Sequence, residues 1–107
     1  MLVRCLYASR MEAPRTPKMW SDILAASRKN NPALGITGVL FTAEDCFIQV
    51  LEGGREQVCT LYNQIAHDPR HSQVTILVFE EIAQRSFEGW SMGEVHVKQI
   101  NPAMLLK

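Results

Sequence analysis

The segment "CFIQVLEGG" (Cys46–Gly54) has the pattern of an apolar β-strand with one amide in its middle, and we expect the strand over Cys46–Glu52. Side chains alternate between the two faces of a strand, so Gln49 shares a face with Phe47 and Leu51. A buried amide without hydrogen-bond partners costs about 1–3 kcal/mol. Gln49 therefore either faces water, bonds to a sheet edge, or has a specific partner inside the protein.

A β-hairpin and a helix are expected around this strand. Gly35–Thr42 has the pattern of a second strand, and the short polar turn Ala43–Asp45 joins the two. We expect the glycine pair Gly53-Gly54 to break the chain, and a helix to follow over Glu56–His67. The apolar residues of this helix recur at amphipathic spacing, at Val58, Leu61, Tyr62 and Ile65.

Two elements precede the hairpin. Leu2–Ala8 is mostly alternating and predicts a first strand. A hydroxyl at Thr16 and a proline at Pro17 are a typical helix start, and we expect that helix to run to about Asn31, because Pro32 follows. The face of the first strand that we expect to be apolar carries Val3, Cys5 and Tyr7.

Two strands are expected after the second helix. Val74–Ile82 begins as an unbroken apolar run, which favours a central strand buried on both faces, and Ser91–Lys98 alternates as a last strand. The order β-α-β-β-α-β-β predicts an α+β, ferredoxin-like fold: a mixed five-stranded sheet with both helices on one face. We expect residues 1–98 to form the domain and residues 99–107 to be a tail or the start of a capping helix.

Composition excludes several classes of protein. The 107 residues suit one domain, and a formal net charge of zero argues against a general nucleic-acid or anionic-membrane surface. Pro69 separates His67 from His71 and breaks any helix that would place both on one metal-binding face. Since there is no CxxC spacing, signal peptide or membrane span, we expect a reducing, cytoplasmic location and no metal. The cysteines are Cys5, Cys46 and Cys59.

Three polar side chains stand where the pattern predicts a core. The apolar stripe of the first helix, Ile23 included, turns polar at Ser27 and then at Asn30 or Asn31. Each polar residue has an ordinary explanation alone: Tyr7 as a core ring with its hydroxyl bonded, an asparagine as a helix end in water. If Tyr7, Asn31 and Gln49 converge under the helices, however, they suit the edge of a flat heteroaromatic ring with alternating donors and acceptors.

Four stretches together resemble the BLUF domain, a blue-light sensor that uses FAD. They occur in the order and spacing of that family and cover nearly the whole chain. The stretches are "CLYAS" (Cys5–Ser9), "SRKNNPALGITGVLF" (Ser27–Phe41), "FIQVLEG" (Phe47–Gly53) and "DPRHSQVTIL…RSFEGWSM" (Asp68–Met92).

The resemblance implies a role for each matching residue. Tyr7 corresponds to the redox-active tyrosine, and Gln49 to the switching glutamine between that tyrosine and flavin N5. Asn31 corresponds to the asparagine that bonds the flavin C4 carbonyl edge, and Asn30 lies along the pyrimidine side. Other residues implied near the flavin are Ser27 and Arg28, with Arg70 and His71 towards the ribityl chain, while Trp90 and Met92 correspond to a signal-relaying pair.

The function implied by the resemblance is light sensing and not catalysis of a reaction. FAD binds non-covalently, with FMN or riboflavin possible in recombinant material. Light drives an electron and a proton from Tyr7 to the flavin, which rearranges the hydrogen bonds around Gln49 and signals through the last strand to a partner protein. We expect a short BLUF protein without an attached effector domain, and a homo-oligomer, because small relatives form dimers or rings.

Two other functions stay open at this level. In a flavin-free ferredoxin-like interaction module, Tyr7 and Gln49 would only satisfy each other in the core. A hydrolase of the acylphosphatase type shares the order of elements, but it needs an arginine in a phosphate-binding loop, and the loop that carries Arg10 has no glycine-rich cradle.

Overall fold

The structure, a computed structural model, describes residues 1–11, 17–42, 46–68 and 71–96. The order β-α-β-β-α-β-β expected from the sequence is confirmed. The elements are β1 (Leu2–Met11), α1 (Pro17–Leu34), β2 (Thr37–Thr42), β3 (Cys46–Gly54), α2 (Arg55–Ala66), β4 (His71–Glu81) and β5 (Gly93–His96).

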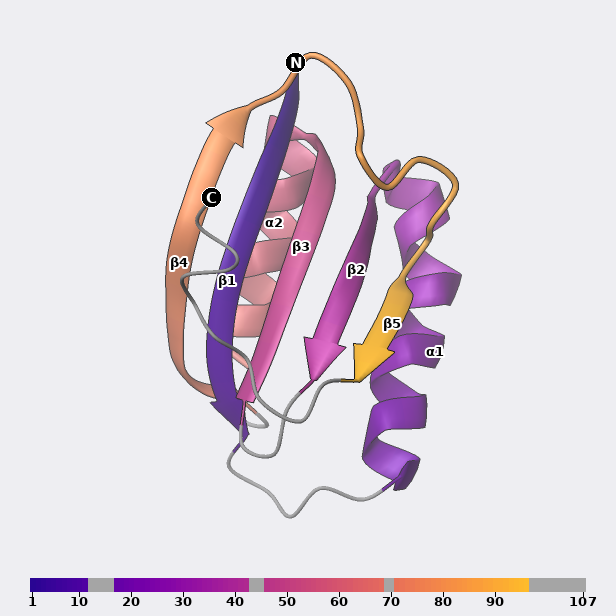
Figure 1. The fold of residues 1–107 in the computed structure, drawn as a ribbon, viewed down its shortest axis with the longest axis vertical. Coiled ribbons are helices and arrows are strands. Elements are labelled where there is room, and N and C mark those ends of the chain that lie inside the picture. Colours follow the sequence, from indigo (N-terminus) through magenta and orange to yellow (C-terminus); the bar gives the residue numbers. More distant parts are fainter. Residues whose placement is uncertain (12–16, 43–45, 69–70, 97–107) are drawn as a thin grey trace.

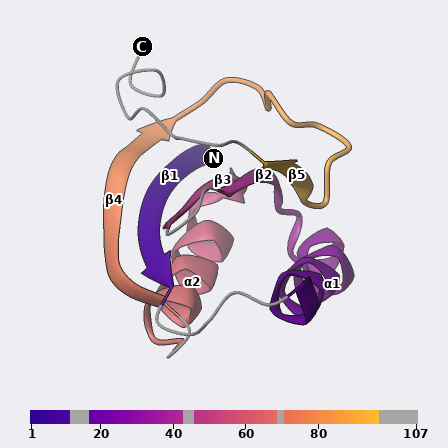
Figure 2. The same ribbon diagram turned by 60° about the horizontal axis from the view of Figure 1, so that its bottom comes forward.

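The strands form one five-stranded sheet in the order β4-β1-β3-β2-β5 (Figure 1). The pairs β1–β3, β1–β4 and β2–β3 are antiparallel, and β2–β5 is parallel, so the sheet is mixed as expected. Both helices cover the same face of the sheet, and the connection from β4 to β5 crosses the other, open face (Figure 2). The predicted ferredoxin-like arrangement is therefore present.

Strand register places the predicted core residues on the helix-covered face. Tyr7 lies opposite Gln49 and Cys5 opposite Leu51, so these four side chains point to the same side of the sheet. The main core lies between this face and the helices. Its buried residues are Val3, Cys5, Tyr7, Leu24, Ile36, Leu40, Phe47, Leu51, Val58 and Met92.

A second apolar cluster occupies the open face of the sheet. Leu6, Val39, Ile48 and Val50 form it, and Phe87 of the β4–β5 connection packs against it. Because the connection covers this face, the sheet is buried on both sides over its central strands.

Helix α1 ends at Leu34 and not at Asn31, so the prediction that Pro32 ends it is wrong. Proline in the last turn removes one backbone donor but does not prevent the turn from closing. Gly35, with φ +68°, ends the helix instead: its N–H donates to the carbonyl of Pro32 at 3.2 Å, and that of Ile36 donates to the carbonyl of Asn31 at 3.0 Å.

The glycine pair continues β3 and does not break it, which corrects a second expectation. A side chain at Gly53 would come within 3.0 Å of the Gly35 carbonyl oxygen, so the absence of a side chain at Gly53 permits the loop after α1 to approach the strand. Gly54 is also the N-cap residue of α2.

Strand β4 lies at an edge of the sheet, so the prediction of a central strand buried on both faces is wrong. Ile76 is 44% exposed and Phe79 is 37% exposed. The β1–β4 register shifts between Leu6 and Tyr7. Leu77 and Val78 therefore both pack against the open-face cluster, which explains why two consecutive residues of the run are apolar.

The remaining boundaries differ at element ends. Strand β1 extends three residues beyond the expected Ala8, to Met11, and β5 covers Gly93–His96 of the expected Ser91–Lys98. The predicted turn Ala43–Asp45 and residues 99–107 lie outside the described residues.

Candidate functional site

A cavity of about 550 Å³ lies between the two helices over the middle of the sheet. Both helices and the strands β1, β2 and β3 contribute to its walls. The lining side chains combine apolar groups with polar ones that can fix the orientation of a ligand, as in a small-molecule site. The apolar ones include Ile23, Leu40, Phe47, Leu61 and Ile65, and the polar ones Tyr7, Ser27, Lys29, Asn30, Asn31, Gln49, Gln64 and Asp68.

Tyr7 and Gln49 form the buried centre of this site. Tyr7 is 1% exposed and Gln49 is 4% exposed. The Tyr7 hydroxyl donates to Oε1 of Gln49, and Nε2 of Gln49 donates to Sδ of Met92 at 3.3 Å. Both ends of the amide are therefore engaged, and a phenol, an amide and a thioether form one continuous hydrogen-bonded chain.

The surroundings of Tyr7 keep its phenol protonated. Burial raises the pKa of Tyr7 far above its ordinary value, and the negative charges that Cys5, Tyr62 and Asp68 can carry raise it further. The Tyr62 ring packs edge-on against the Tyr7 ring, with the centroids 5.7 Å apart. Burial also raises the pKa of Tyr62. Tyr7 is thus a hydrogen-bond donor to Gln49 over the whole physiological pH range.

The last turns of α1 bind the segment that precedes β5. Nδ2 of Asn31 donates to the Ser91 carbonyl at 2.9 Å, and Nε of Arg28 donates to the Met92 carbonyl at 3.2 Å. Asn31 is 1% exposed although it lies near a helix end, so the explanation that this helix end emerges into water does not apply to it. The position of Met92 is set by contacts from both α1 and β3.

The structure brings most of the predicted site residues together. Ser27, Asn30 and Asn31 line the cavity with Tyr7 and Gln49, whereas Arg28 is not among the lining residues. Two predicted residues are not placed: Arg70 lies outside the described residues, and only the backbone of His71 is described.

The two predicted relay residues differ in orientation. Met92 is 3% exposed and contacts Gln49, whereas Trp90 is 47% exposed; neither residue is among those that line the cavity. The Trp90 ring packs instead against Phe87, with the centroids 5.6 Å apart.

Sequence reasoning missed Lys29, Gln64 and Asp68, which also line the cavity. Gln64 and Asp68 each follow a cavity-lining apolar residue of α2 by three positions, namely Leu61 and Ile65. Gln64 lies between apolar members of the α2 stripe and Asp68 lies just beyond the helix, so the same helical spacing indicates both.

The described residues contain no cluster of side chains that could hold a metal ion. In the same part of the chain, neither helix combines the length and the apolar character needed to cross a membrane.

Residues 2–93 match the family described as "BLUF: Sensors of blue-light using FAD". The fold is similar to the dark-state structure of BlrB, a BLUF protein, at 37% identity and a TM-score of 0.86, covering 89% of this chain and 72% of that one. It is also similar to the ground state of BlsA, at 37% identity and a TM-score of 0.87, covering 92% of this chain and 66% of that one.

Curated relatives are longer proteins. The photoactivated adenylate cyclase subunit beta of Euglena longa is 29% identical over an alignment of 107 positions that covers 96% of this chain and 12% of that protein. The blue light- and temperature-regulated antirepressor BluF of Escherichia coli K12 is 30% identical over 87 residues, 81% of this chain and 22% of that protein. The chain thus spans about an eighth to a fifth of these relatives.

The chain belongs to the BLUF family and is a blue-light sensor domain that uses FAD, not an enzyme. The flavin-free interaction module and the hydrolase are therefore set aside. The site fits a flavin on its own chemistry: Tyr7, Asn31 and Gln49 bring buried phenol and amide groups to a cavity whose other walls are largely apolar.

Proposed function

We propose that Tyr7 and Gln49 are the light-responsive pair of this sensor, and that the cavity between α1 and α2 holds the flavin ring. The observation that carries the proposal is the buried hydrogen-bonded chain from Tyr7 through Gln49 to Met92, of which Tyr7 and Gln49 line that cavity. A neutral amide in this position can change partners without any movement of the backbone.

Side chains from α1 and β3 would hold the flavin. Asn30 and Asn31 can donate and accept along one edge of a ring, as can Gln49, while Ser27 supplies a hydroxyl. We expect Arg70 and His71 to lie towards the ribityl chain. Bound FAD supplies the absorption of blue light and the capacity to accept an electron and a proton.

Tyr7 supplies the electron and the proton in this proposal. Because burial keeps its phenol neutral, the proton is present when light arrives. The hydrogen bond to Oε1 of Gln49 provides the first acceptor for that proton. Gln49 lies on the same face of the sheet and lines the same cavity, so it can pass the proton on.

Gln49 couples this chemistry to Met92. If the amide reverses, its Nε2 faces Tyr7 and its Oε1 faces Sδ of Met92. A thioether sulfur cannot donate, so Met92 then loses its hydrogen bond to Gln49. Loss of one weak bond favours a modest population shift in the segment that leads to β5.

We propose that this shift is read by a partner protein, in the cytoplasm, and that the chain forms homo-oligomers. The free thiols of Cys5 and Cys59 suit a reducing compartment. Among the described strands, β4 has an outer edge without a neighbour, and Ile76 and Phe79 on it are exposed. Such an edge can pair with a strand of a second chain.

Absorption spectroscopy tests the proposal. The purified protein should be yellow, blue light should shift its flavin band slightly to the red, and darkness should reverse the shift. Tyr7→Phe and Gln49→Leu should keep the colour and abolish the shift. Tyr62→Phe is the matched control, because it removes the neighbouring phenol that does not bond to Gln49, and it should keep the shift.

Two results would contradict the proposal. One is a protein that takes up no FAD on refolding in its presence. The other is a full, reversible shift in Tyr7→Phe.

A further inference from the structure

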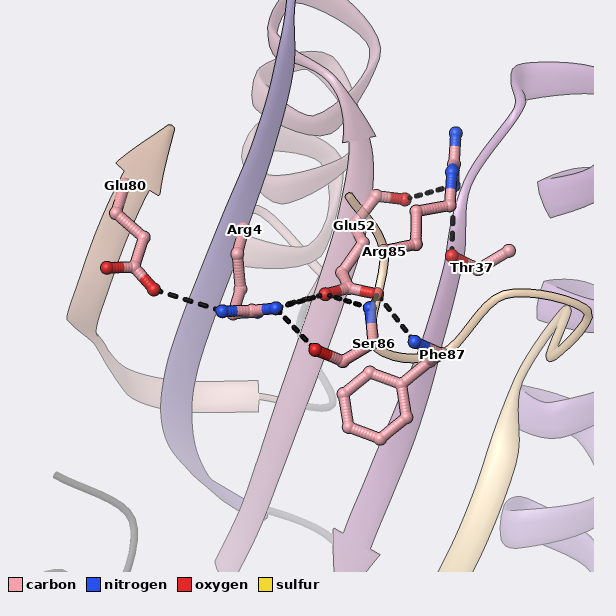
Figure 3. A network of polar contacts seen from close by, with 7 residues as sticks. All are labelled: Arg4, Thr37, Glu52, Glu80, Arg85, Ser86 and Phe87. Atoms are coloured by element: carbon pink, nitrogen blue, oxygen red, sulfur yellow. Dashed lines mark hydrogen bonds and ion pairs between the residues drawn. The ribbon is translucent and has the colours of Figure 1, made fainter. Parts of the chain in front are cut away.

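Strand β3 buries a second polar side chain, Glu52, whose carboxylate is 0% exposed (Figure 3). It lies on the open face of the sheet, since Glu52 and Gln49 are three residues apart on one strand and strand side chains alternate. Its Oε1 accepts hydrogen bonds from the backbone N–H groups of Ser86 and Phe87, at 2.9 and 2.8 Å. The carboxylate therefore binds the connection between β4 and β5 directly.

Arg4 of β1 balances the buried charge. Its guanidinium lies 2.7 Å from Oε2 of Glu52, and its Nε donates to the same oxygen at 2.9 Å. Arg4 also donates to Oγ of Ser86 at 2.7 Å and pairs with Glu80 at 3.1 Å. Every contact of Glu52 with the connection is thus charge-assisted, and such bonds are roughly twice as strong as neutral ones.

Arg85 fixes the same connection to the sheet from the other direction. Its Nη1 donates to Oγ1 of Thr37 and to the backbone carbonyl of Glu52, both at 2.9 Å. Its Nη2 donates to the Gly35 carbonyl at 2.7 Å. Figure 3 shows Arg85 bonded to Thr37 of β2 and to the backbone of Glu52 of β3, while the Glu52 carboxylate binds the next two residues of the connection.

A short, turned segment leads from this anchor to the flavin site. The Trp90 N–H donates to the Phe87 carbonyl at 3.0 Å, and Gly89 permits the turn with φ +84°. The Trp90 carbonyl accepts from the Gly38 N–H at 3.0 Å, which ties the segment to β2. Met92 follows two residues later and receives the hydrogen bond from Gln49.

Strand β3 therefore contacts both ends of the segment from Ser86 to Met92, one on each face of the sheet. We propose that Glu52 is a positioning residue for the switch: by fixing the backbone at Ser86 and Phe87, it sets the place of Met92 against Gln49. The proposal rests on the proposed function of Gln49, but the displacement of Met92 can be measured without light.

The two contacts differ in strength. Glu52 accepts several charge-assisted bonds, whereas the side chain of Met92 accepts one bond from a neutral amide to sulfur, its backbone carbonyl being held separately by Arg28. A change of partner at Gln49 should therefore release the Met92 side chain while Ser86 and Phe87 stay in place.

The experiment uses the FAD-loaded protein in the dark. The ¹³C-methyl resonance of Met92, assigned with Met92→Leu, reports its position, and amide hydrogen exchange reports the anchor. Glu52→Ala should move or broaden the Met92 resonance and speed exchange at Ser86 and Phe87 about tenfold. Glu52→Gln and Arg85→Gln should change both readouts in the same direction by less, and they decide the question if Glu52→Ala does not fold.

Glu80→Gln is the matched control. It makes the same carboxylate-to-amide change beside Arg4, but within the described residues Glu80 pairs with Arg4 and not with the connection, so both readouts should stay as in the unmodified protein. An unmoved Met92 resonance in folded Glu52 and Arg85 variants would overturn the proposal. So would a Glu80→Gln variant that moves Met92 as far as Glu52→Gln does.

The test of Glu52 can succeed or fail independently of the test of the proposed photochemistry. If light fails to shift the flavin band of the unmodified protein, the proposed photochemistry fails, while the dark-state position of Met92 still tests Glu52.

Discussion

Strand β3 buries a polar side chain on each face of the sheet, and the two are bound in opposite ways. On the helix-covered face, Gln49 has neutral partners, the Tyr7 phenol and the Met92 thioether. On the open face, Glu52 has a guanidinium and two backbone N–H groups. The side chain proposed to switch is the one whose partners can be exchanged at little cost, and the side chain with charged partners is fixed.

The largest expected effect compares these two residues by stability. Glu52→Ala should lower the free energy of unfolding by about 3 kcal/mol or more, because the buried network loses its acceptor and Arg4 its partner. Gln49→Leu should cost only about 1 kcal/mol, since it removes neutral hydrogen bonds from an apolar environment. Urea unfolding in the dark measures both. A Gln49→Leu cost equal to that of Glu52→Ala would contradict the comparison.

The second prediction concerns the Cys5 thiol and the Tyr7 phenol, which are both buried on the helix-covered face. Burial, and then the nearby Cys59, raise the pKa of the Cys5 thiol from 9.0 to about 11. The folded state therefore keeps this proton when the unfolded chain has lost it. The free energy of unfolding should be unaffected by Cys5 below pH 9 and should fall by on the order of 2 kcal/mol as pH rises towards 11. Tyr7, whose pKa is also raised, adds to the fall above pH 10.

Urea unfolding at several pH values, with Cys5→Ala as the comparison, isolates the thiol. The variant should show a flatter decline above pH 9, whatever its stability at neutral pH. An unchanged decline would mean that the thiol is not held protonated by its surroundings.

The third prediction tests the contact between Gln49 and Met92. Met92→Leu preserves most of the apolar volume but removes the sulfur acceptor, so it should cost about 1 kcal/mol of stability. The side-chain amide protons of Gln49 should also exchange faster with water. In a double-mutant cycle with Gln49→Leu, the two costs should not add. Full additivity would show that the hydrogen bond contributes nothing.

The smallest effect is expected for Ile76, on the edge strand β4. Ile76 lies opposite Tyr7 in the register but is 44% exposed, because the helices do not cover β4 there. Ile76→Lys should change stability by less than about 0.5 kcal/mol. If two copies pair through β4, the same variant should lower the sedimenting mass. A loss of several kcal/mol would show that Ile76 is covered.

The sequence predicted those features that depend on local pattern. Strand alternation put Tyr7 with Val3 and Cys5, and Gln49 with Phe47 and Leu51, but left open whether Gln49 faces water; the register put Tyr7 and Gln49 opposite each other on a buried face. Helical spacing led from Ile23 to Ser27 and Asn31, all three of which line the cavity. The BLUF resemblance supplied the identity of the ligand, which no spacing could give.

The failures have one local cause and two that depend on partners distant in the chain. Pro32 does not end α1, because the helix is closed by backbone bonds at Gly35 and Ile36. The apolar run of β4 resembles a buried central strand, yet strand order placed it at an edge. Glu52 drew no attention in the sequence, because a glutamate before two glycines at a strand end is ordinarily exposed.

The sequence by itself determined the order of elements, the shared face of Tyr7 and Gln49, and several of the polar residues that line the cavity. Only the tertiary structure decided which strands are edges, that Met92 and not Trp90 contacts Gln49, and that Glu52 is buried. The physical reason is that periodicity fixes which way a side chain points. What it meets there depends on segments such as the β4–β5 connection, which reach it only when the chain has folded.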